Sequence, residues 1–125
     1  GLFGPTRSCS ASATQDLLRQ IANRQYFDGA DQTFRQFGLT REDLTIRFGD
    51  IRELGADRRK TACAAEMTIH LSEGYLAKPE TEAQGREALL RLGFSNGLRL
   101  PITYDLTTTE DGRLYAEVRG LSGRR

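Results

Sequence analysis

Two cysteines, one histidine and a scatter of acidic residues are the side chains in this sequence that could carry chemistry. Cys9 and Cys63 do not form a CxxC pair, and His70 is the single histidine. A zinc site with four Cys or His ligands therefore cannot be assembled from them. We expect neither a bound metal nor a cofactor. The two cysteines are either free buried thiols or partners in a disulfide bond.

Acid–base catalysis would need His70 beside a nucleophile, or two carboxylates that converge in a cleft. The alternation of its strand places His70 on the outward side, and no serine or cysteine nucleophile is recognisable beside it. Glu66, Asp105 and Glu117 also fall on outward strand faces, where arginines are interleaved with them. Cross-strand ion pairing is the simpler interpretation of that pattern. We therefore predict no catalytic residues and a protein that is not an enzyme.

The bulk composition narrows the class of protein. A length of 125 residues fits one domain, and 38% hydrophobic with 28% charged residues is too apolar for a disordered chain. No run of about 18 apolar residues is present, so we expect no transmembrane segment. Eighteen basic residues meet 17 acidic ones, a balance that argues against nucleic acid as a partner. Sixteen of the basic residues are arginine, which GC-rich coding explains more simply than anion recognition.

Hydrophobic periodicity predicts the elements that must position these residues. A helix is expected over about residues 13–26, with Ser12 or Thr14 as its cap. A second helical turn or packed loop follows around Phe34 and Phe37. From residue 44 the period drops to two, which indicates a strand, and its phase slips where residues 49–50 would form a bulge.

The second half of the chain continues this pattern. Residues 55–59 read as a turn, and the strand from Cys63 to Leu71 has the clearest alternation, with Cys63 facing the core. A helix is expected from Pro79 to Leu92, with Gly93 in the left-handed cap position. Two further strands are joined by a hairpin turn at residues 110–112. Pro101 in the first of them indicates that one side of that strand is unpaired or bulged.

The order helix, strand, strand, short helix, strand, strand predicts an α+β fold. The N-terminal helix would pack on a four-stranded, mainly antiparallel sheet, with a short helix inserted between strands 2 and 3. Cystatin-like and NTF2-like rolls have this architecture. We expect residues 1–12 to be a flexible segment after a removed signal or anchor, residues 13–120 to be the domain and residues 121–125 to be a tail.

The predicted fold favours a disulfide between Cys9 and Cys63. Cys63 faces the core, and Cys9 lies just ahead of the helix that should cover that core. A bond between them would close a loop of about 55 residues and stabilise the domain by roughly 4 kcal/mol through loop-closure entropy.

Several segments carry a family resemblance: Asp50–Leu54, Thr61–Glu66, Ile102–Leu106, Glu110–Gly112 and Tyr115–Val118. Across roughly residues 9–119, the chain resembles small exported domains of proteobacteria, often lipoproteins, whose function is not established. The resemblance implies a location in the periplasm or cell envelope. Members of that type carry a lipoprotein cysteine, and neither cysteine here fits, since Arg7 and Ser8 precede Cys9.

One outward set is the most typical of a binding interface, because Tyr and Arg are enriched at binding hot spots. It comprises Arg99, Arg113, Tyr115, Arg119 and His70. An ordinary solvated sheet face is the alternative. We expect a non-enzymatic envelope module that binds another macromolecule, such as an envelope or secreted protein. Two further hypotheses are an inhibitor or immunity protein that blocks a toxin or hydrolase, and a small NTF2-like ligand-binding protein or enzyme. The apolar inward residues count against the latter.

Overall fold

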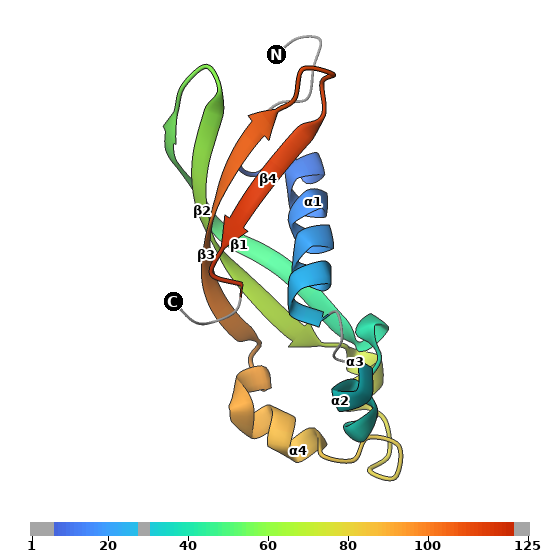
Figure 1. The fold of residues 1–125 in the computed structure, drawn as a ribbon. Helices are drawn as coiled ribbons and strands as arrows, with labels where there is room; N and C mark the ends of the chain where they lie inside the picture. Colours follow the sequence, from blue (N-terminus) through green and yellow to red (C-terminus); the bar gives the residue numbers. More distant parts are fainter. Residues whose placement is uncertain (1–6, 28–30, 122–125) are drawn as a thin grey trace.

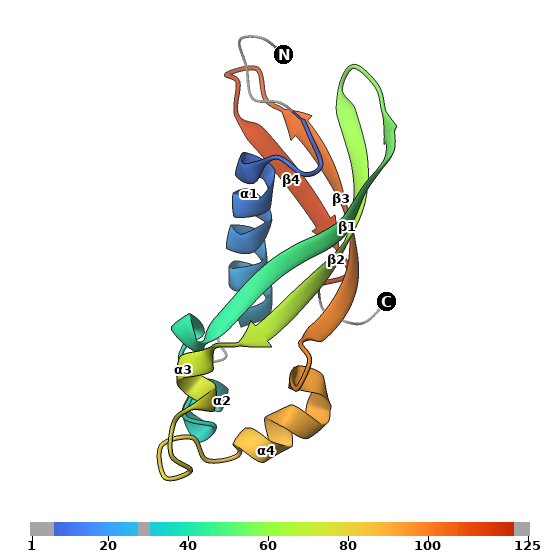
Figure 2. The ribbon, with the colours of Figure 1, turned by 180° about the vertical axis from the view of Figure 1, so that it is seen from behind.

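One long helix covers one face of a four-stranded antiparallel sheet, and shorter helices gather at one end of that sheet (Figures 1 and 2). These features come from a computed structural model that describes residues 7–27 and 31–121. The predicted α+β fold is confirmed, while its assignment to the cystatin-like or NTF2-like rolls stays a prediction. Within the described ranges, no helix has the length and apolar character needed to cross a membrane.

The long helix, α1 (Ser12–Ala22), continues into a π-helical turn at Asn23–Phe27. Its N-cap residue is Ala11, which offers no side-chain cap, so the prediction of Ser12 or Thr14 as the cap is wrong. Thr14 lies buried in the first turn, and its hydroxyl donates to the carbonyl of Ser8 at 2.7 Å. This hydroxyl therefore bonds to the segment that precedes the helix and does not cap the helix N-terminus.

The sheet is a simple meander in which each strand pairs with the next along the chain. Its strands are β1 (Leu44–Ala56), β2 (Lys60–Leu71), β3 (Leu98–Thr108) and β4 (Leu114–Arg119), all antiparallel. The order β1-β2-β3-β4 leaves β1 and β4 as the two edges. Short connections between consecutive strands favour this antiparallel arrangement.

β1 carries two register shifts against β2. The first, between Gly49 and Arg52, is the predicted bulge, and Asp50 within it has a φ of +51°. The second lies between Glu53 and Gly55, just before the predicted turn at residues 55–59. The strand instead runs on to Ala56.

The turn that ends the β1–β2 hairpin is narrower than predicted, and the Asp57 side chain organises it. Its carboxylate accepts the backbone N–H groups of Arg59 at 2.7 Å and Lys60 at 2.8 Å. These bonds lower the pKa of the Asp57 carboxyl, because they stabilise its charged form. Local side-chain bonding thus restricts the turn to residues 57–59.

The main core lies between α1 and the inward face of the sheet. The alternation predicted for β2 is confirmed, since Cys63, Met67 and Ile69 are fully buried while His70 and Thr68 are not. The larger side chains that are nearly inaccessible to solvent here are Leu18, Met67, Ile69, Tyr104 and Leu106. This core holds α1 against the sheet, where β4 is the strand that it contacts most closely.

A second cluster fills the helical end of the molecule. It is formed by Leu39, Leu71, Tyr75, Ala83 and Leu89. The elements around it are α2 (Asp31–Gln36), a 3₁₀ turn (Arg41–Asp43), α3 (Glu73–Leu76), α4 (Arg86–Leu89) and the segment Leu90–Phe94. Phe34 and Phe94 pack against both clusters, so the helical end and the sheet share a continuous apolar interior.

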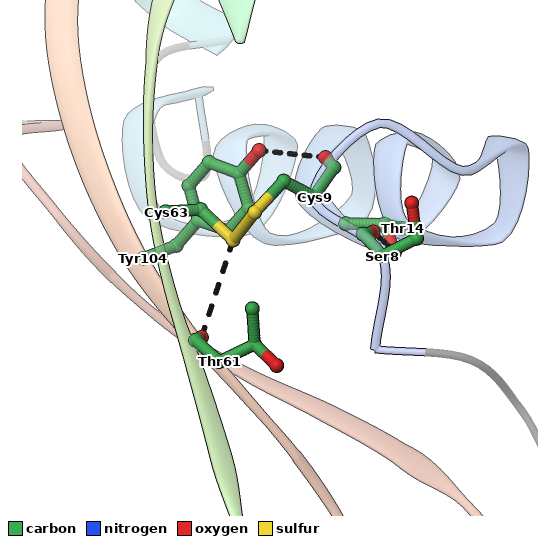
Figure 3. The surroundings of a disulfide bond; sticks show 6 residues. All are labelled: Ser8, Cys9, Thr14, Thr61, Cys63 and Tyr104. Atoms are coloured by element: carbon green, nitrogen blue, oxygen red, sulfur yellow. Dashed lines mark hydrogen bonds between the residues drawn. A yellow bond between two sulfur atoms is a disulfide. The ribbon is translucent and has the colours of Figure 1, made fainter. Parts of the chain in front are cut away.

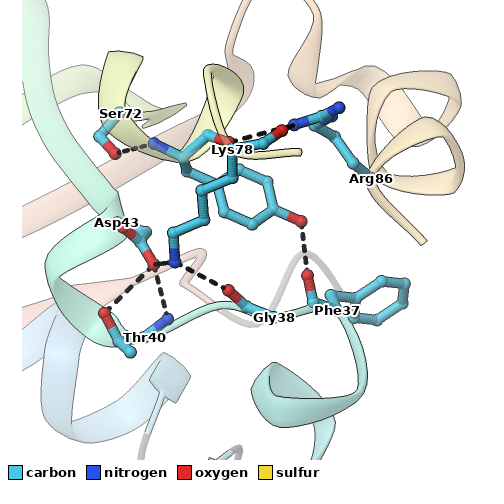
Figure 4. A network of polar contacts seen from close by, with 8 residues as sticks. Phe37, Gly38, Thr40, Asp43, Ser72, Lys78 and Arg86 are labelled. Atoms are coloured by element: carbon cyan, nitrogen blue, oxygen red, sulfur yellow. Dashed lines mark hydrogen bonds and ion pairs between the residues drawn. The ribbon is translucent and has the colours of Figure 1, made fainter. Parts of the chain in front are cut away.

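A polar network fixes the helical end (Figure 4). The hydroxyl of Tyr75 donates to the carbonyl of Phe37 at 2.6 Å, and Arg86 donates to the carbonyls of Tyr75 and Leu76 at the C-terminal end of α3. Lys78 donates to the carbonyl of Gly38 at 3.4 Å. Arg86 thereby bonds the Leu76 carbonyl, one of those that a helix end leaves without an intrahelical partner, and adds a second donor to the Tyr75 carbonyl, which also accepts the Lys78 N–H.

The predicted helix from Pro79 to Leu92 is wrong in its first half, because residues 77–85 are mainly turns and α4 begins at Arg86. Tertiary contacts decide this segment. A Cβ at Gly38 would meet the Glu82 carbonyl oxygen at 2.1 Å, and one at Gly85 would meet the Phe37 ring at 2.5 Å. Gly85 also has a φ of +80°, which suits glycine and ends a right-handed helix.

Candidate functional site

The disulfide pairs the residues that the sequence suggested (Figure 3). Cys9 and Cys63 are bonded, with their Cα atoms 5.8 Å apart, and both side chains are buried. Beside them, the hydroxyl of Tyr104 donates to the carbonyl of Cys9 at 2.7 Å, and burial raises the pKa of this phenol. The disulfide and this hydrogen bond fix the start of α1 against β2 and β3.

The five residues proposed as an interface are spread along the outer face of the sheet, over β2, β3, β4 and the turn before β4. On the outer face, Arg99 lies opposite Thr68, whereas Tyr115 lies opposite Thr107. Eight residues of β3 separate these positions, about 27 Å at the usual rise per residue of a strand. His70 lies beyond Arg99, at the far end of β2. Arg113, Tyr115 and Arg119 thus follow β4 and the residue before it, while Arg99 and His70 lie toward the other end of the outer face.

Ion pairs involve two of these arginines. Arg119 donates to the carboxylate of Asp105 at 3.1 Å, across the β3–β4 pair, as the cross-strand interpretation predicted. Arg113 precedes β4 and pairs with Asp111 of the same hairpin turn at 3.4 Å. These exposed pairs each contribute less than about 1 kcal/mol to stability.

His70 packs against backbone at the end of β3. A Cβ at Gly97 would lie 2.8 Å from the His70 ring, so the ring covers this glycine. The side chain is half-buried on the outer face. Its position indicates a packing role at the sheet's end.

The register of β4 decides which of its backbone groups face outward. Antiparallel residues alternate between hydrogen-bonded and non-hydrogen-bonded pairs. The N–H of Thr109 donates to the carbonyl of Arg113, and the pairing continues without a shift to Arg119. Alternate residues from Arg113 onward therefore bond to β3. The N–H and C=O groups of the remaining β4 residues point away from the sheet: Leu114, Ala116 and Val118.

Those outward groups have no partner among the residues that the structure describes. A groove of about 520 Å³ runs beside them, between α1 and β4. Leu17 and Ile21 of α1 face Leu114 and Val118 across it, and Arg24 lies at its rim. Tyr115, 60% exposed, lines the same groove. The β4 edge thus combines an open backbone, an apolar groove and an exposed aromatic ring.

The opposite edge is capped at one carbonyl and interrupted by bulges. The N–H of Ser72 donates to the carbonyl of Asp43, so the same alternation points the backbone of Ile46 outward. The Arg19 side chain of α1 donates to that carbonyl at 3.1 Å and lies over the Phe48 ring. The two bulges interrupt the rest of β1. Side-chain capping and bulges are known ways in which proteins protect sheet edges.

The described titratable groups form no arrangement suited to metal binding: no three His, Cys, Asp or Glu side chains cluster within residues 7–27 and 31–121. The pKa of the Asp57 carboxyl is lowered, and the pKa values of the Tyr75 and Tyr104 phenols are raised. Turn bonding causes the first, and burial is the main cause of the other two. The β4 edge, by contrast, presents backbone hydrogen-bonding groups beside an apolar groove.

Tyr115 and Arg119 belong to the predicted interface set, whereas the groove and the open edge were not predicted. The signal available in the sequence was the inward alternation of Leu114 and Val118, which was assigned to the core. Both are only partly buried, and both line the groove between α1 and β4. Which strand lies at the edge depends on strand order, and that is a tertiary property.

Compared with known proteins, the chain matches no family model, no curated protein and no solved structure.

Proposed function

We propose that this domain is a non-enzymatic protein-binding module of the periplasm or cell envelope, and that it recognises its partner through β4. The observation that carries the proposal is the open β4 edge beside the groove between α1 and β4. Extended segments bind such edges by main-chain hydrogen bonds, while neighbouring pockets accept alternate side chains.

The chemistry of the β4 surface supports this choice. Tyr115 is 60% exposed, and Arg113 and Arg119 flank it on the outer face. Tyrosine and arginine contribute disproportionately to binding energy at protein interfaces. Leu17 and Ile21 provide apolar area in the adjoining groove. Backbone pairing and side-chain contact would therefore act together.

An exported location is supported by the disulfide between Cys9 and Cys63. Disulfides persist in oxidising compartments and are rare where cytosolic thiols keep cysteines reduced. The location is tested by trapping free thiols in the native cells before lysis, then counting labelled cysteines in the denatured protein. A blocked pair is expected, and two labelled thiols per chain would contradict export.

The binding function is tested by pull-down from an envelope extract with matched variants at the two sheet edges. Tyr115→Ala/Arg119→Glu alters the β4 surface. Thr45→Ala/Arg47→Glu makes similar changes on β1, where both side chains are also exposed. We expect the β4 variant to lose the partner that the wild type and the β1 variant recover. Equal recovery by all three would refute β4 as the binding surface.

A further inference from the structure

We propose that the β4 edge binds a second copy of this chain, so that two sheets join in antiparallel fashion into one of eight strands. This inference rests on the proposed role of β4 as the binding surface and names its occupant. The argument comes from the registers that two copies of β4 could adopt and from the charges that each register brings together.

Two β4 strands related by a two-fold axis must pair through the outward groups of Leu114, Ala116 and Val118. The axis can then pass through Tyr115, Ala116 or Glu117. Each choice places a different set of outer-face side chains opposite one another, and directly opposed side chains interact most strongly across an antiparallel pair.

Charge selects among these three registers. An axis at Ala116 sets Arg113 opposite Arg119 of the other copy, twice. An axis at Glu117 opposes two glutamates. An axis at Tyr115 sets Arg113 opposite Glu117 in both directions and places the two Tyr115 rings side by side. The Tyr115 register alone joins opposite charges and an aromatic pair, both of which are favourable across strands.

The inward side of this register is also compatible with pairing. Leu114 of each copy lies opposite Ala116 of the other, a large residue beside a small one. The groove lined by Leu17 and Ile21 opens at the same edge, so the second copy would cover part of its apolar surface. Removal of such surface from water favours association.

Disulfide trapping in purified protein tests the register. In a non-hydrogen-bonded pair the two Cα atoms lie about 4.5 Å apart, within the range that a disulfide spans. Tyr115→Cys should therefore cross-link two chains under mild oxidation. Glu117→Cys is the matched control, because in this register two Glu117 residues are separated by four strand positions, about 13 Å. Equal or faster cross-linking of Glu117→Cys would overturn the register.

Sedimentation across a range of protein concentrations tests the association itself. The wild type should dimerise. Arg113→Glu should raise the dimer Kd by about tenfold, because the new glutamate at 113 of each copy would face Glu117 of the other. The exchanged variant Arg113→Glu/Glu117→Arg should restore the wild-type Kd. A wild type that stays monomeric at all concentrations, or an exchange that fails to restore association, would overturn the proposal.

These outcomes are separable from those of the proposed function. A monomeric wild type that still recovers a different protein through β4 retains the binding function and refutes the second copy as occupant. Conversely, a dimer that recovers no protein besides itself supports the inference and contradicts binding of another envelope protein.

Discussion

The two edges of the sheet differ in regularity and in what covers their outward backbone groups. β1 has 13 residues, two register shifts and an arginine from α1 on the carbonyl of Ile46. β4 has six residues and pairs with β3 without a shift, and its outward groups meet no described partner. Both edges lie beside the same helix.

The difference concerns how well each edge strand is protected from pairing with another chain. An uncovered edge strand is a liability in a soluble protein, because it pairs readily with other strands. β1 meets that liability with bulges and Arg19. β4 limits it by its short length and keeps a regular ladder of donors and acceptors. Protection at β1 and openness at β4 fit the proposal that another chain binds at β4.

The largest expected effect concerns the disulfide that holds α1, the helix beside both edges. The Cys9→Ala/Cys63→Ala variant frees the start of α1, and we expect it to lose about 4 kcal/mol of unfolding free energy in urea. Tyr104→Phe is the control, since it keeps the disulfide and removes one hydrogen bond, at a cost of about 1 kcal/mol. Equal urea midpoints for the double variant and the wild type would show that α1 is held without the disulfide.

The bulge at β1 is the next target. Asp50 has a φ of +51°, a region that a β-branched residue enters at a cost of about 1–2 kcal/mol. Asp50→Val should therefore destabilise the domain by that amount, measured by thermal or urea unfolding. Asp50→Asn should be nearly neutral, because asparagine tolerates this conformation. Similar stabilities for the Val and Asn variants would refute a conformational requirement at the bulge.

Removal of Arg19 should make β1 resemble β4. Arg19→Ala leaves the Ile46 carbonyl uncapped and should cost about 1 kcal/mol in unfolding free energy. It should also increase self-association in sedimentation runs, because a second edge becomes available. Gln20→Ala, on the exposed side of the same helix, serves as the control. Unchanged association in Arg19→Ala would mean that the bulges alone protect β1.

The hairpin turn of β1 gives a pH-dependent test. The pKa of Asp57 is lowered below 3.8 by its bonds to the Arg59 and Lys60 amides, so its stabilising contribution is present above 3.8 and is lost as the pH falls. Wild type should exceed Asp57→Asn in stability at neutral pH, and the gap should narrow below pH 3.8. A gap independent of pH in urea unfolding would contradict this role.

The smallest change in unfolding free energy is expected at His70, because it lies on the central strand β2 and on neither edge strand. We expect His70→Ala to change the unfolding free energy by no more than about 0.5 kcal/mol, as is usual for such positions. Gly97→Ala beneath it should cost more, because its Cβ would meet the His70 ring and its φ is +91°. A large loss in His70→Ala would indicate that the ring is a required part of the sheet's end.

Local patterning accounts for much of this fold. The period of two in β2 predicted that Cys63 and Met67 face the core, and both are buried. His70, predicted to face outward, is more exposed than either. The phase slip near Gly49 located a bulge because side chains must alternate across a sheet. Pro101 correctly indicated an unpaired side, since the pairing of β4 begins at Thr103. These features depend on residues within a few positions of one another.

Contacts between distant segments decided the rest. Glu82 and Gly85 are turned rather than helical because Gly38 and Phe37, more than 40 positions earlier, pack against them. The open edge likewise depends on strand order, since the same six residues in a central strand would have both sides paired. The sequence by itself determined which faces are apolar and where the chain turns. The tertiary structure alone decided which strand is left at the edge. A strand's hydrogen bonds are made with distant residues, and the strand's own sequence does not specify which ones.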